Sequence, residues 1–476
     1  MTATGLTARL AAHIAGARLE QVSPQALRMT RLSLLDALGV TLAASQLGEG
    51  VAAFAEVARD TGGRPEAGVI GFGFRTSSLA AVLVNGAGAH ALDFEDAYDG
   101  APIHPNAACV PVAVALAERL DASGPDILTA LAVGCDLVCR LGLALKVNPD
   151  EAGWYPPPIL GAFGAAATAA RLLGLDAAQT AAALALTLNQ ATATAQFKTD
   201  PTSTLRGVRD AFPAHAGLLS ALLAKRGVSG FDGVFEGKAG LFTLFAKGQY
   251  DEAVLTDDLG ERFHGEHLSF KPWPSCRGTH AFIEAALDLR EAHDLAPDMI
   301  AQIIMTGGGV QRMLAEPAAQ KQAPLTAIDA KFSLPFTTAL ALVHGVVTLD
   351  SYAPGRLADP AVLALAARST FVLNPRATLR DAAAGALTLV LRSGQTLTRH
   401  IAHPLGAPQN PIGESQIVAK FQDCAARAFR PASDADLATL SETVLSLETI
   451  AKPAAALACL TGDSITKRRY TPWPAR

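Results

Sequence analysis

Apolar residues recur every three or four positions over most of the first 260 residues, which is the spacing of amphipathic α-helices. From Met29 to Leu42 they mark one face of a helix that begins at Ser23-Pro24, a serine cap followed by proline. Similar runs at 162–175, 178–195 and 214–227 predict further helices, joined by short loops rich in glycine, proline and aspartate. This part of the chain is therefore predicted to be nearly all-helical.

The pattern changes after His267. Met299–Met305 is short and rich in β-branched residues, as strands are. Ala386–Leu391 and Thr396–Ile401 read as two strands around the turn sequence RSGQ, which predicts a hairpin. The segment after His267 is therefore predicted to mix helices and strands.

Helical periodicity returns in residues 415–461, so the last helices are expected to pack with the first ones. The predicted fold class is mainly α. A large all-helical domain comprises residues 1–268 and 412–476, and a smaller α+β lid domain, residues 269–411, is inserted into it.

Composition raises the possibility of a membrane protein, because 50% of the residues are apolar and only 17% are charged. Three uncharged stretches, at 152–170, 177–197 and 332–349, approach the length of about 20 residues that a spanning helix needs. Each contains proline or several polar residues, and none has basic residues on one flank only. We therefore expect buried helices of a soluble protein.

Charge and cysteine content narrow the class further. The net charge is −5, and no basic stripe with interleaved aromatic residues occurs, which excludes a nucleic-acid-binding surface. The six cysteines form no C-x-x-C pair and no disulfide framework, so a reducing, cytoplasmic setting is expected.

One glycine-rich motif is misleading. The segment GAGAHA at 86–91 matches the dinucleotide-binding pattern, but no acidic residue follows about 20 positions later, and strands and helices do not alternate around it. Close packing of helices explains its small residues better.

A carboxylate cluster follows directly, with Asp93, Glu95, Asp96 and Asp99 ahead of His104. Asp93 and Asp96 are expected to share a helix face, and such carboxylates can orient a histidine for proton transfer. The alternative is a solvated helix end, but the strongly apolar flanking segments favour a cleft. The spacing matches no metal-ligand pattern, and no metal is predicted.

A second motif is FKPWPSCRGTH at 270–280, which contains Lys271, Cys276, Arg277 and His280. Two cations near a histidine favour a carboxylate-binding site. A reactive pair of Cys276 and His280 is a weaker alternative, because four residues of separation do not establish contact. Arg209, in RGVRDAFPAHAG, could join an anion site or lie on a surface loop.

In these motifs the chain resembles the MmgE/PrpD family, which includes 2-methylcitrate dehydratase, cis-aconitate decarboxylase and iminodisuccinate epimerase. The matching stretches follow the family's order along nearly the whole chain, at 34–40, 85–96, 104–105, 161–175, 270–280, 329–336 and 403–412. The resemblance implies the same two-domain arrangement, homodimers, an active site between the domains, and no cofactor or metal. It also implies active-site roles for Asp93, His104 and Lys271.

Four positions depart from the decarboxylase pattern. Glu95 replaces a usual aspartate, Ala97 a usual threonine and Tyr155 a frequent histidine, while Cys276 replaces the decarboxylase histidine, as it does in other members. Two missing imidazoles argue against cis-aconitate decarboxylation.

The activities named above all make or protonate a carbanion beside a carboxylate, which requires nearby cations and a base. His104, oriented by Asp93, is the predicted base, and Tyr155 or His280 is the second proton carrier. Lys271 is predicted to be catalytic, and the predicted substrate-binding residues are Arg277, Arg209, Cys276 and Asp96.

The predicted function is a lyase that adds or removes water on a small hydroxy di- or tricarboxylate. Two alternatives stay open. One is an isomerase or epimerase of a small dicarboxylate, which needs two proton carriers and no leaving group. The other is a non-catalytic carboxylate-binding homologue, which Ala97 and Tyr155 favour.

Overall fold

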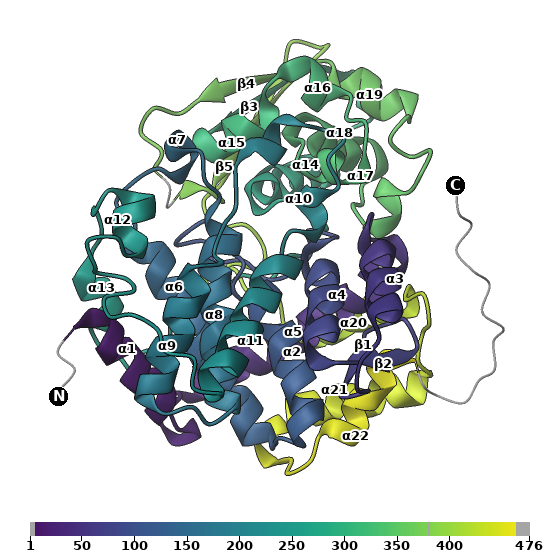
Figure 1. The fold of residues 1–476 in the computed structure, drawn as a ribbon. Helices are drawn as coiled ribbons and strands as arrows, with labels where there is room; N and C mark the ends of the chain where they lie inside the picture. The colour runs from purple at the N-terminus through teal and green to yellow at the C-terminus, as the bar shows by residue number, and fades with distance from the viewer. Residues whose placement is uncertain (1–4, 379–380, 463–476) are drawn as a thin grey trace.

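The computed structural model describes residues 5–378 and 381–462 (Figure 1). Helices fill its N-terminal part as predicted: α1 (Leu6–Gly16), α2 (Pro24–Leu47), α3 (Val51–Thr61), α4 (Ser78–His90), α5 (Pro105–Leu120), α6 (Gly124–Ala144), α7 (Pro149–Ala152), α8 (Pro156–Leu172), α9 (Ala177–Leu188), α10 (Leu205–Val208), α11 (Ala211–Lys225), α12 (Leu241–Ala246) and α13 (Glu252–Thr256). A small hairpin of β1 (Ala67–Val69) and β2 (Phe74–Thr76) interrupts them, so this region is not entirely helical.

The predicted cap of the second helix is present, because the Ser23 hydroxyl accepts a hydrogen bond from the N–H of Ala26 (3.1 Å). The segment GAGAHA lies inside or just after α4, and the residues directly before it, 78–85, are helical rather than a strand. A Cβ at Gly86 would lie 2.9 Å from the carbonyl oxygen of Asp210, so this glycine permits close packing against the start of α11. The structure thus agrees with a packing role rather than a nucleotide-binding loop.

The second part mixes helices and strands: α14 (His280–Ala292), β3 (Ile300–Gly307), α15 (Gly309–Ala315), α16 (Ala318–Gln322), α17 (Ala327–Lys331), α18 (Leu334–His344), α19 (Pro360–Ala366), β4 (Ser369–Leu373), β5 (Gly385–Leu391) and β6 (Thr396–Ile401). The chain ends in α20 (Glu414–Ala426), α21 (Asp434–Leu445) and α22 (Ala454–Leu457). These last helices lie beside the N-terminal ones (Figure 1), and α2 packs against α20. The predicted mainly α fold class is confirmed.

A four-stranded sheet has the order β4-β3-β5-β6. The predicted hairpin is confirmed, with antiparallel pairing of β5 and β6 and Gly394 in a left-handed conformation at the turn (φ 89°). The parallel strand β4 was not predicted; it pairs with β3 after α19 brings the chain back along the sheet.

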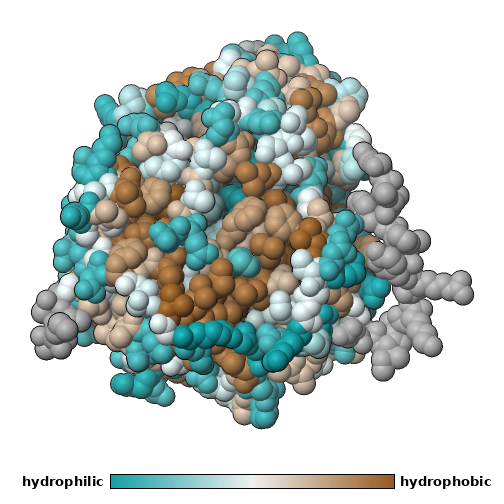
Figure 2. All heavy atoms as spheres, viewed as in Figure 1, coloured by the Kyte–Doolittle hydropathy of each residue, from teal (hydrophilic) through white to brown (hydrophobic). Residues whose placement is uncertain are grey.

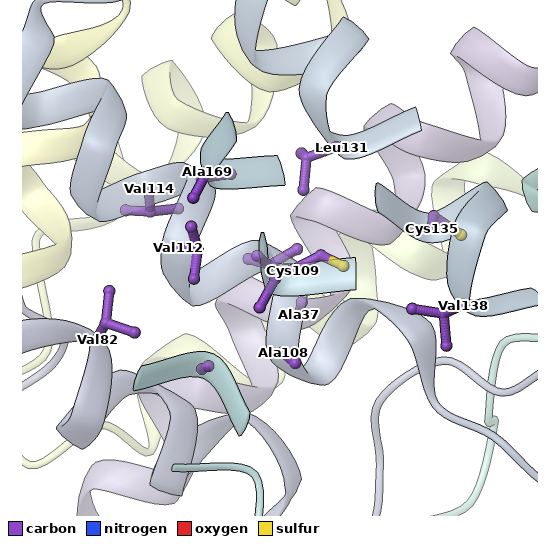
Figure 3. Packing of buried hydrophobic residues seen from close by; sticks show 14 of the residues in the cluster. Ala37, Val82, Ala108, Cys109, Val112, Val114, Leu131, Cys135, Val138 and Ala169 are labelled. Atoms are coloured by element: carbon purple, nitrogen blue, oxygen red, sulfur yellow. The ribbon is translucent and has the colours of Figure 1, made fainter. Parts of the chain in front are cut away.

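Small residues let the central helices approach closely. At the crossing of α6 and α8, a Cβ at Gly134 would lie 2.1 Å from the Thr168 hydroxyl oxygen, and one at Gly164 would lie 2.3 Å from a methyl of Val138. Figure 3 shows the alanine, valine and cysteine side chains that fill the neighbouring space, Cys109 and Cys135 among them. Both cysteines are buried core residues.

Apolar packing divides into two main cores. The larger joins N-terminal residues up to Phe270 with residues from Ile412 to Leu460, and the second spans Ala281–Ile401. The domain boundaries at 268/269 and 411/412 stay a prediction, because an apolar core shows which residues pack together and not where an independent domain begins or ends.

The apolar composition is visible in one buried helix and in one patch on the surface. Helix α6 is long and apolar enough to cross a membrane, and 94% of its apolar window is buried inside the fold. Figure 2 shows apolar side chains gathered over α9 and α11. Phe212, Val228 and Phe231, on α11 and the loop after it, are each about half exposed.

Candidate active site

The loop between α4 and α5 carries the carboxylate cluster. The chain turns at Asp93, which adopts a left-handed conformation (φ 49°) and whose N–H donates to the carbonyl of His90 (2.8 Å). Asp93 and Asp96 therefore do not share a helix face, contrary to the prediction. Ala97 pairs with Ser269 through two backbone hydrogen bonds (2.9 and 2.7 Å), which brings the segment containing Lys271 beside this loop.

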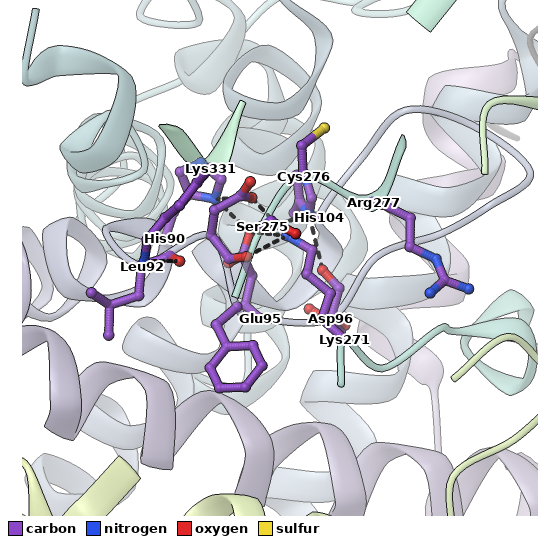
Figure 4. A network of polar contacts seen from close by, with 12 residues as sticks. His90, Leu92, Glu95, Asp96, His104, Lys271, Ser275, Cys276, Arg277 and Lys331 are labelled. Atoms are coloured by element: carbon purple, nitrogen blue, oxygen red, sulfur yellow. Dashed lines mark hydrogen bonds and ion pairs between the residues drawn. The ribbon is translucent and has the colours of Figure 1, made fainter. Parts of the chain in front are cut away.

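Buried cations hold the backbone of this loop. Three lysines from distant parts of the chain donate to successive carbonyl oxygens: Lys331 to Leu92 (2.7 Å), Lys271 to Asp93 (3.1 Å) and Lys420 to Phe94 (2.6 Å). Lys331 lies on α17 and Lys420 on α20, so both main parts of the fold set the conformation of the loop. Figure 4 shows Lys331 pointing toward Leu92 and the two histidines around Glu95.

Lys271 forms the central ion pair. Its Nζ lies 2.6 Å from Oδ1 of Asp93 and 3.7 Å from Oε1 of Glu95, and all three side chains are buried. Burial acts to lower the pKa of Lys271, but the two carboxylates raise it above its ordinary value. Burial likewise acts to raise the pKa of Asp93, and Lys271 and His90 together lower it. The pair is therefore ionised in the folded protein.

Two histidines meet at one carboxylate oxygen. Oε1 of Glu95 contacts Nδ1 of His90 and lies 3.1 Å from Nδ1 of His104. The Nδ1 of His104 also lies 2.9 Å from the carbonyl oxygen of Asp96. Both neighbours of this Nδ1 are acceptors, so it carries the proton and leaves a lone pair on Nε2. Within the described chain no hydrogen-bond partner reaches that Nε2, and His104 lines a cavity.

Arg209 completes the chain of contacts behind His90. Its Nη1 donates to Nε2 of His90, so His90 is a neutral imidazole with its proton on Nδ1, facing Glu95. Burial, with Arg209 second, holds the pKa of His90 well below its ordinary range. Burial and then Lys271 lower the pKa of His104 to about 3. Both histidines are therefore neutral near pH 7.

Asp96 has a different environment. It is buried, Oδ2 accepts from the side-chain amide of Asn106 (2.7 Å), and Oδ1 has no hydrogen-bond partner. Burial raises its pKa to about 7. Asp96 does not line the cavity, and its contribution to His104 comes from its backbone carbonyl.

The cavity beside His104 lies where the two main parts of the fold meet and encloses about 830 Å³, including its open mouth. Of the predicted site residues, four line it: His104, Tyr155, Cys276 and Arg277. Asp93, Lys271 and Arg209 lie buried behind this wall. Asp93 pairs with Lys271, and Lys271 lies near Glu95, which contacts His104 on the wall. Arg209 contacts His90 and lies over the ring of Tyr155 on the wall.

Tyr155 stands at the wall between two cations. Nζ of Lys198 lies 4.6 Å from the centre of the Tyr155 ring, and the guanidinium of Arg209 lies 4.9 Å from it. Burial raises the pKa of Tyr155, so its phenol stays protonated. Burial also raises the pKa of the Cys276 thiol to about 11, with Asp93 the second cause, so the thiol is not a nucleophile near neutral pH.

Arg277 and His280 are engaged within the protein. Arg277 donates to both oxygens of Asp99 (3.0 and 2.9 Å) and to the carbonyls of Pro404 and Leu405. His280 is fully buried, its Nε2 contacts the carbonyl of Ser275 (3.1 Å), and it is absent from the cavity wall. The structure therefore does not bring His280 to the position of a second proton carrier.

A metal site can be tested against these contacts. The side chains of His90, Asp93, Glu95 and His104 offer ligand atoms within 4.8 Å of one another. Lys271 already places its ammonium between Asp93 and Glu95, and both histidines direct an N–H toward Glu95. The arrangement thus suits a lysine cation rather than a metal ion.

Comparison with known proteins identifies the family of the chain. A model of the MmgE/PrpD N-terminal domain matches residues 8–253, and a model of the MmgE/PrpD C-terminal domain matches residues 273–445. The chain belongs to the MmgE/PrpD family. The family resemblance predicted from the motifs is confirmed.

The chain is similar to several proteins named as cis-aconitate decarboxylases or decarboxylase-like proteins. The chain is 30% identical to the cis-aconitate decarboxylase-like protein oryM of Aspergillus oryzae over 421 residues, which cover 83% of this chain and 85% of the relative. It is 25% identical to the cis-aconitate decarboxylase of Mus musculus over 472 residues (94% and 92%) and 27% identical to that of Homo sapiens over 397 residues (81% and 79%).

The sequence analysis did not predict two parts of this candidate site. His90 and Glu95 form the contact network of His104, but His90 was read only as part of the glycine-rich motif GAGAHA. Its signal was available, since a histidine five residues before a glutamate ends an apolar helix. Lys331 lies in the matching stretch 329–336 but was not singled out, and Lys420 gave no local signal, because a lone lysine on a helix is usually solvent-exposed.

Proposed function

We propose that this protein is a lyase that removes water from, or adds it to, a small carboxylate by proton transfer beside the carboxylate. The observation that carries the proposal is the neutral His104, held by Glu95 and the Asp96 carbonyl with its Nε2 left to the cavity. A metal or cofactor is not part of the proposal. The homodimer that the resemblance implies and the cytoplasmic setting that the cysteine pattern predicts belong to it.

In the dehydration direction, Nε2 of His104 takes the proton from the carbon next to the carboxylate. The electron pair of that C–H bond forms the C=C bond, and the neighbouring C–O bond breaks. The protonated His104 is stabilised by the carboxylate of Glu95, which lies 3.1 Å from its Nδ1 and 3.7 Å from the ammonium of Lys271. The proton on His104 then returns to solvent.

The departing hydroxyl needs a proton donor. Tyr155 lines the same cavity, and its raised pKa keeps the phenol protonated. The nearby cations Lys198 and Arg209 stabilise the phenolate that forms when Tyr155 donates. Tyr155 is therefore the proposed acid, in place of a second imidazole.

Positive charge must neutralise the carboxylate beside the reacting carbon. Lys198 lines the cavity. Arg206 is buried, with its guanidinium carbon 3.5 Å from the ring centre of Phe332, a lining residue, and it forms no ion pair with any carboxylate of the described residues. Burial lowers the pKa of Arg206, but a guanidinium stays charged. Both groups are proposed to face the carboxylate.

Decarboxylation is the second candidate, because the relatives above are named for it. It protonates the same carbon after carbon dioxide leaves and has no hydroxyl leaving group. Release of carbon dioxide from a substrate that neither loses nor gains water would favour decarboxylation over dehydration.

The Tyr155→Phe variant tests the proposed acid. Loss of the phenol is expected to lower the rate of dehydration by about 10²-fold, while exchange of the carbon-bound hydrogen in deuterated water continues. Product analysis and mass spectrometry measure the two rates on one substrate. Tyr250→Phe, at a tyrosine stacked on Phe242 away from the cavity, should change neither rate. Equal loss of the dehydration rate and the exchange rate in Tyr155→Phe would contradict the proposal that Tyr155 is the acid and His104 the base.

The pH dependence tests the base. The pKa of His104 is about 3, so the imidazole stays neutral as the pH falls from 8 to 5. We expect kcat/KM to change by less than about threefold over this range, whereas an ordinary histidine of pKa about 6.5 would lose roughly 30-fold at pH 5. Asp96 titrates near pH 7, so Asp96→Asn is the control for its charge. A fall in kcat/KM below about pH 6.5 in both the native protein and Asp96→Asn would contradict the assignment of His104 as a base of low pKa.

A further inference from the structure

Asp36 is a buried carboxyl group that the proposed reaction does not use. It lies on α2, in the stretch LLDALGV at 34–40, and is only 1% exposed. Its Oδ1 lies 2.7 Å from Nζ of Lys420, which reaches it from α20. Burial raises the pKa of Asp36, and Lys420 acts against this rise. The pair holds the end of the Lys420 side chain in one place, because separating two buried partners leaves a charge uncompensated.

Close helix packing brings Lys420 to Asp36. Gly39 follows Asp36 by three residues on α2, so the two residues share a helix face. A Cβ at Gly39 would lie 3.0 Å from Cα of Phe421, the residue after Lys420. A side chain at this position would push α20 away from α2. The glycine and the aspartate of LLDALGV therefore act together to place the Lys420 ammonium.

The same ammonium joins the two segments that carry the candidate site. Nζ of Lys420 donates to the carbonyl oxygen of Phe94 (2.6 Å) and to that of Lys271 (3.0 Å). It also lies 3.8 Å from the centre of the Phe94 ring. An ammonium has three N–H donors, and Asp36 and the two carbonyls match that number. One side chain thus links the residue before Glu95 to the backbone of Lys271.

This link lies where the backbone pairing of the two segments ends. Ala97 and Ser269 pair as antiparallel strands do, and the same register would place Glu95 opposite Lys271. Among the described residues no backbone hydrogen bond joins Glu95 to Lys271, and Lys420 bridges the segments there instead. A displacement of Lys420 would therefore change the 3.7 Å distance between Nζ of Lys271 and Oε1 of Glu95.

We infer that Lys420, held in place by Asp36, is a positioning residue for the proposed active site. It sets the distance between Lys271 and Glu95, and Oε1 of Glu95 lies 3.1 Å from Nδ1 of the proposed base His104. The inference rests on the proposed function for its effect on turnover, whereas the spacing itself does not depend on the reaction. Helix α20 is thereby part of the site, although none of its residues, all of them described, lines the cavity.

Lys420→Met removes the ammonium and leaves an unbranched side chain. We expect kcat to fall about 10- to 100-fold and KM to change by less than about threefold, because the catalytic groups are misplaced and the cavity wall is intact. The assay uses whichever of malate, 2-methylmalate and citrate the native protein converts fastest. Lys225→Met is the matched control, since Lys225 also donates from a helix to a backbone carbonyl, that of Leu173 (2.8 Å). Equal kcat in the two variants would overturn the inference.

A double variant separates positioning from charge balance. Lys420→Met leaves the buried Asp36 without its cation, so part of its effect comes from lower stability. Adding Asp36→Asn removes that charge and should raise the midpoint of urea unfolding. It should leave kcat low, because the carbonyls of Phe94 and Lys271 still lack their donor. Native kcat in the double variant would show that Lys420 only neutralises Asp36, which would overturn the inference.

Hydrogen exchange measured by mass spectrometry tests the spacing without any substrate. In Lys420→Met the amides of residues 94–99 and 268–272 should exchange about tenfold faster under conditions where the protein is folded, and Lys225→Met should match the native protein there. Unchanged exchange would overturn the inference even in a protein that dehydrates malate. Faster exchange in a protein that dehydrates none of the three hydroxy acids would contradict the proposed function and support the role of Lys420.

Discussion

Replacing His104 by asparagine is expected to lower kcat by about 10²- to 10⁴-fold, the range found when a general base is lost. The amide nitrogen of asparagine can take the place of Nδ1 and still donate to the carbonyl of Asp96, which His104 contacts at 2.9 Å. The variant lacks Nε2, so it keeps the local hydrogen bond and loses the base. Steady-state kinetics on the carboxylate that the native protein converts fastest measures the effect.

Two further measurements make the His104→Asn result specific. Binding of succinate, a small unreactive carboxylate, and the midpoint of thermal unfolding should stay close to the native values, because the rest of the cavity is unchanged. His293→Gln, at an exposed histidine after α14, should retain full activity. Native turnover by His104→Asn would show that another group removes the proton.

Replacing Lys271 by methionine is expected to impair both stability and turnover. The ammonium is buried and lies 2.6 Å from Asp93 and 3.7 Å from Glu95, so its removal leaves two buried carboxylates without their cation. Removing one partner of a buried ion pair costs about 3–5 kcal/mol of unfolding free energy. We expect the protein to fold in mild conditions, with kcat lowered by about 10²- to 10³-fold because the charge near Glu95 is lost.

Matched variants separate the two effects of Lys271→Met. Lys271→Met combined with Asp93→Asn should recover part of the unfolding free energy, measured by urea denaturation, without recovering turnover. Lys321→Met breaks another buried ion pair, with Asp329 (2.9 Å), away from the carboxylate loop. It should lower stability and preserve kcat. Equal activity of Lys271→Met and Lys321→Met at equal folded fractions would contradict a catalytic role for Lys271.

Local patterns predicted much of the fold because helices and hairpins depend on nearby residues. The Ser23-Pro24 start of α2 and the hairpin of β5 and β6 both formed as predicted. Strand β4 was missed because it forms through parallel pairing with β3, more than 60 residues earlier in the chain. Its sequence, STFVL, resembles many short apolar segments.

The site was predictable as a set of segments but not as a set of contacts. His104, Tyr155, Cys276 and Arg277 came to one cavity as expected from the motifs. The predicted orientation of His104 by Asp93 is not what the contacts show, because the chain turns at the left-handed Asp93 and directs its side chain elsewhere. Glu95 takes that place, and Asp93 instead pairs with Lys271.

The sequence by itself determined the mainly α architecture, the family and the segments that carry the chemistry, because periodicity, caps and motifs are properties of neighbouring residues. Only the tertiary structure decided which groups touch. The contacts of Lys331 and Lys420 with the loop join residues more than 200 positions apart, and no local pattern records such separations. Burial, likewise a tertiary property, lowers the pKa of His104 to about 3, so the imidazole is neutral near pH 7.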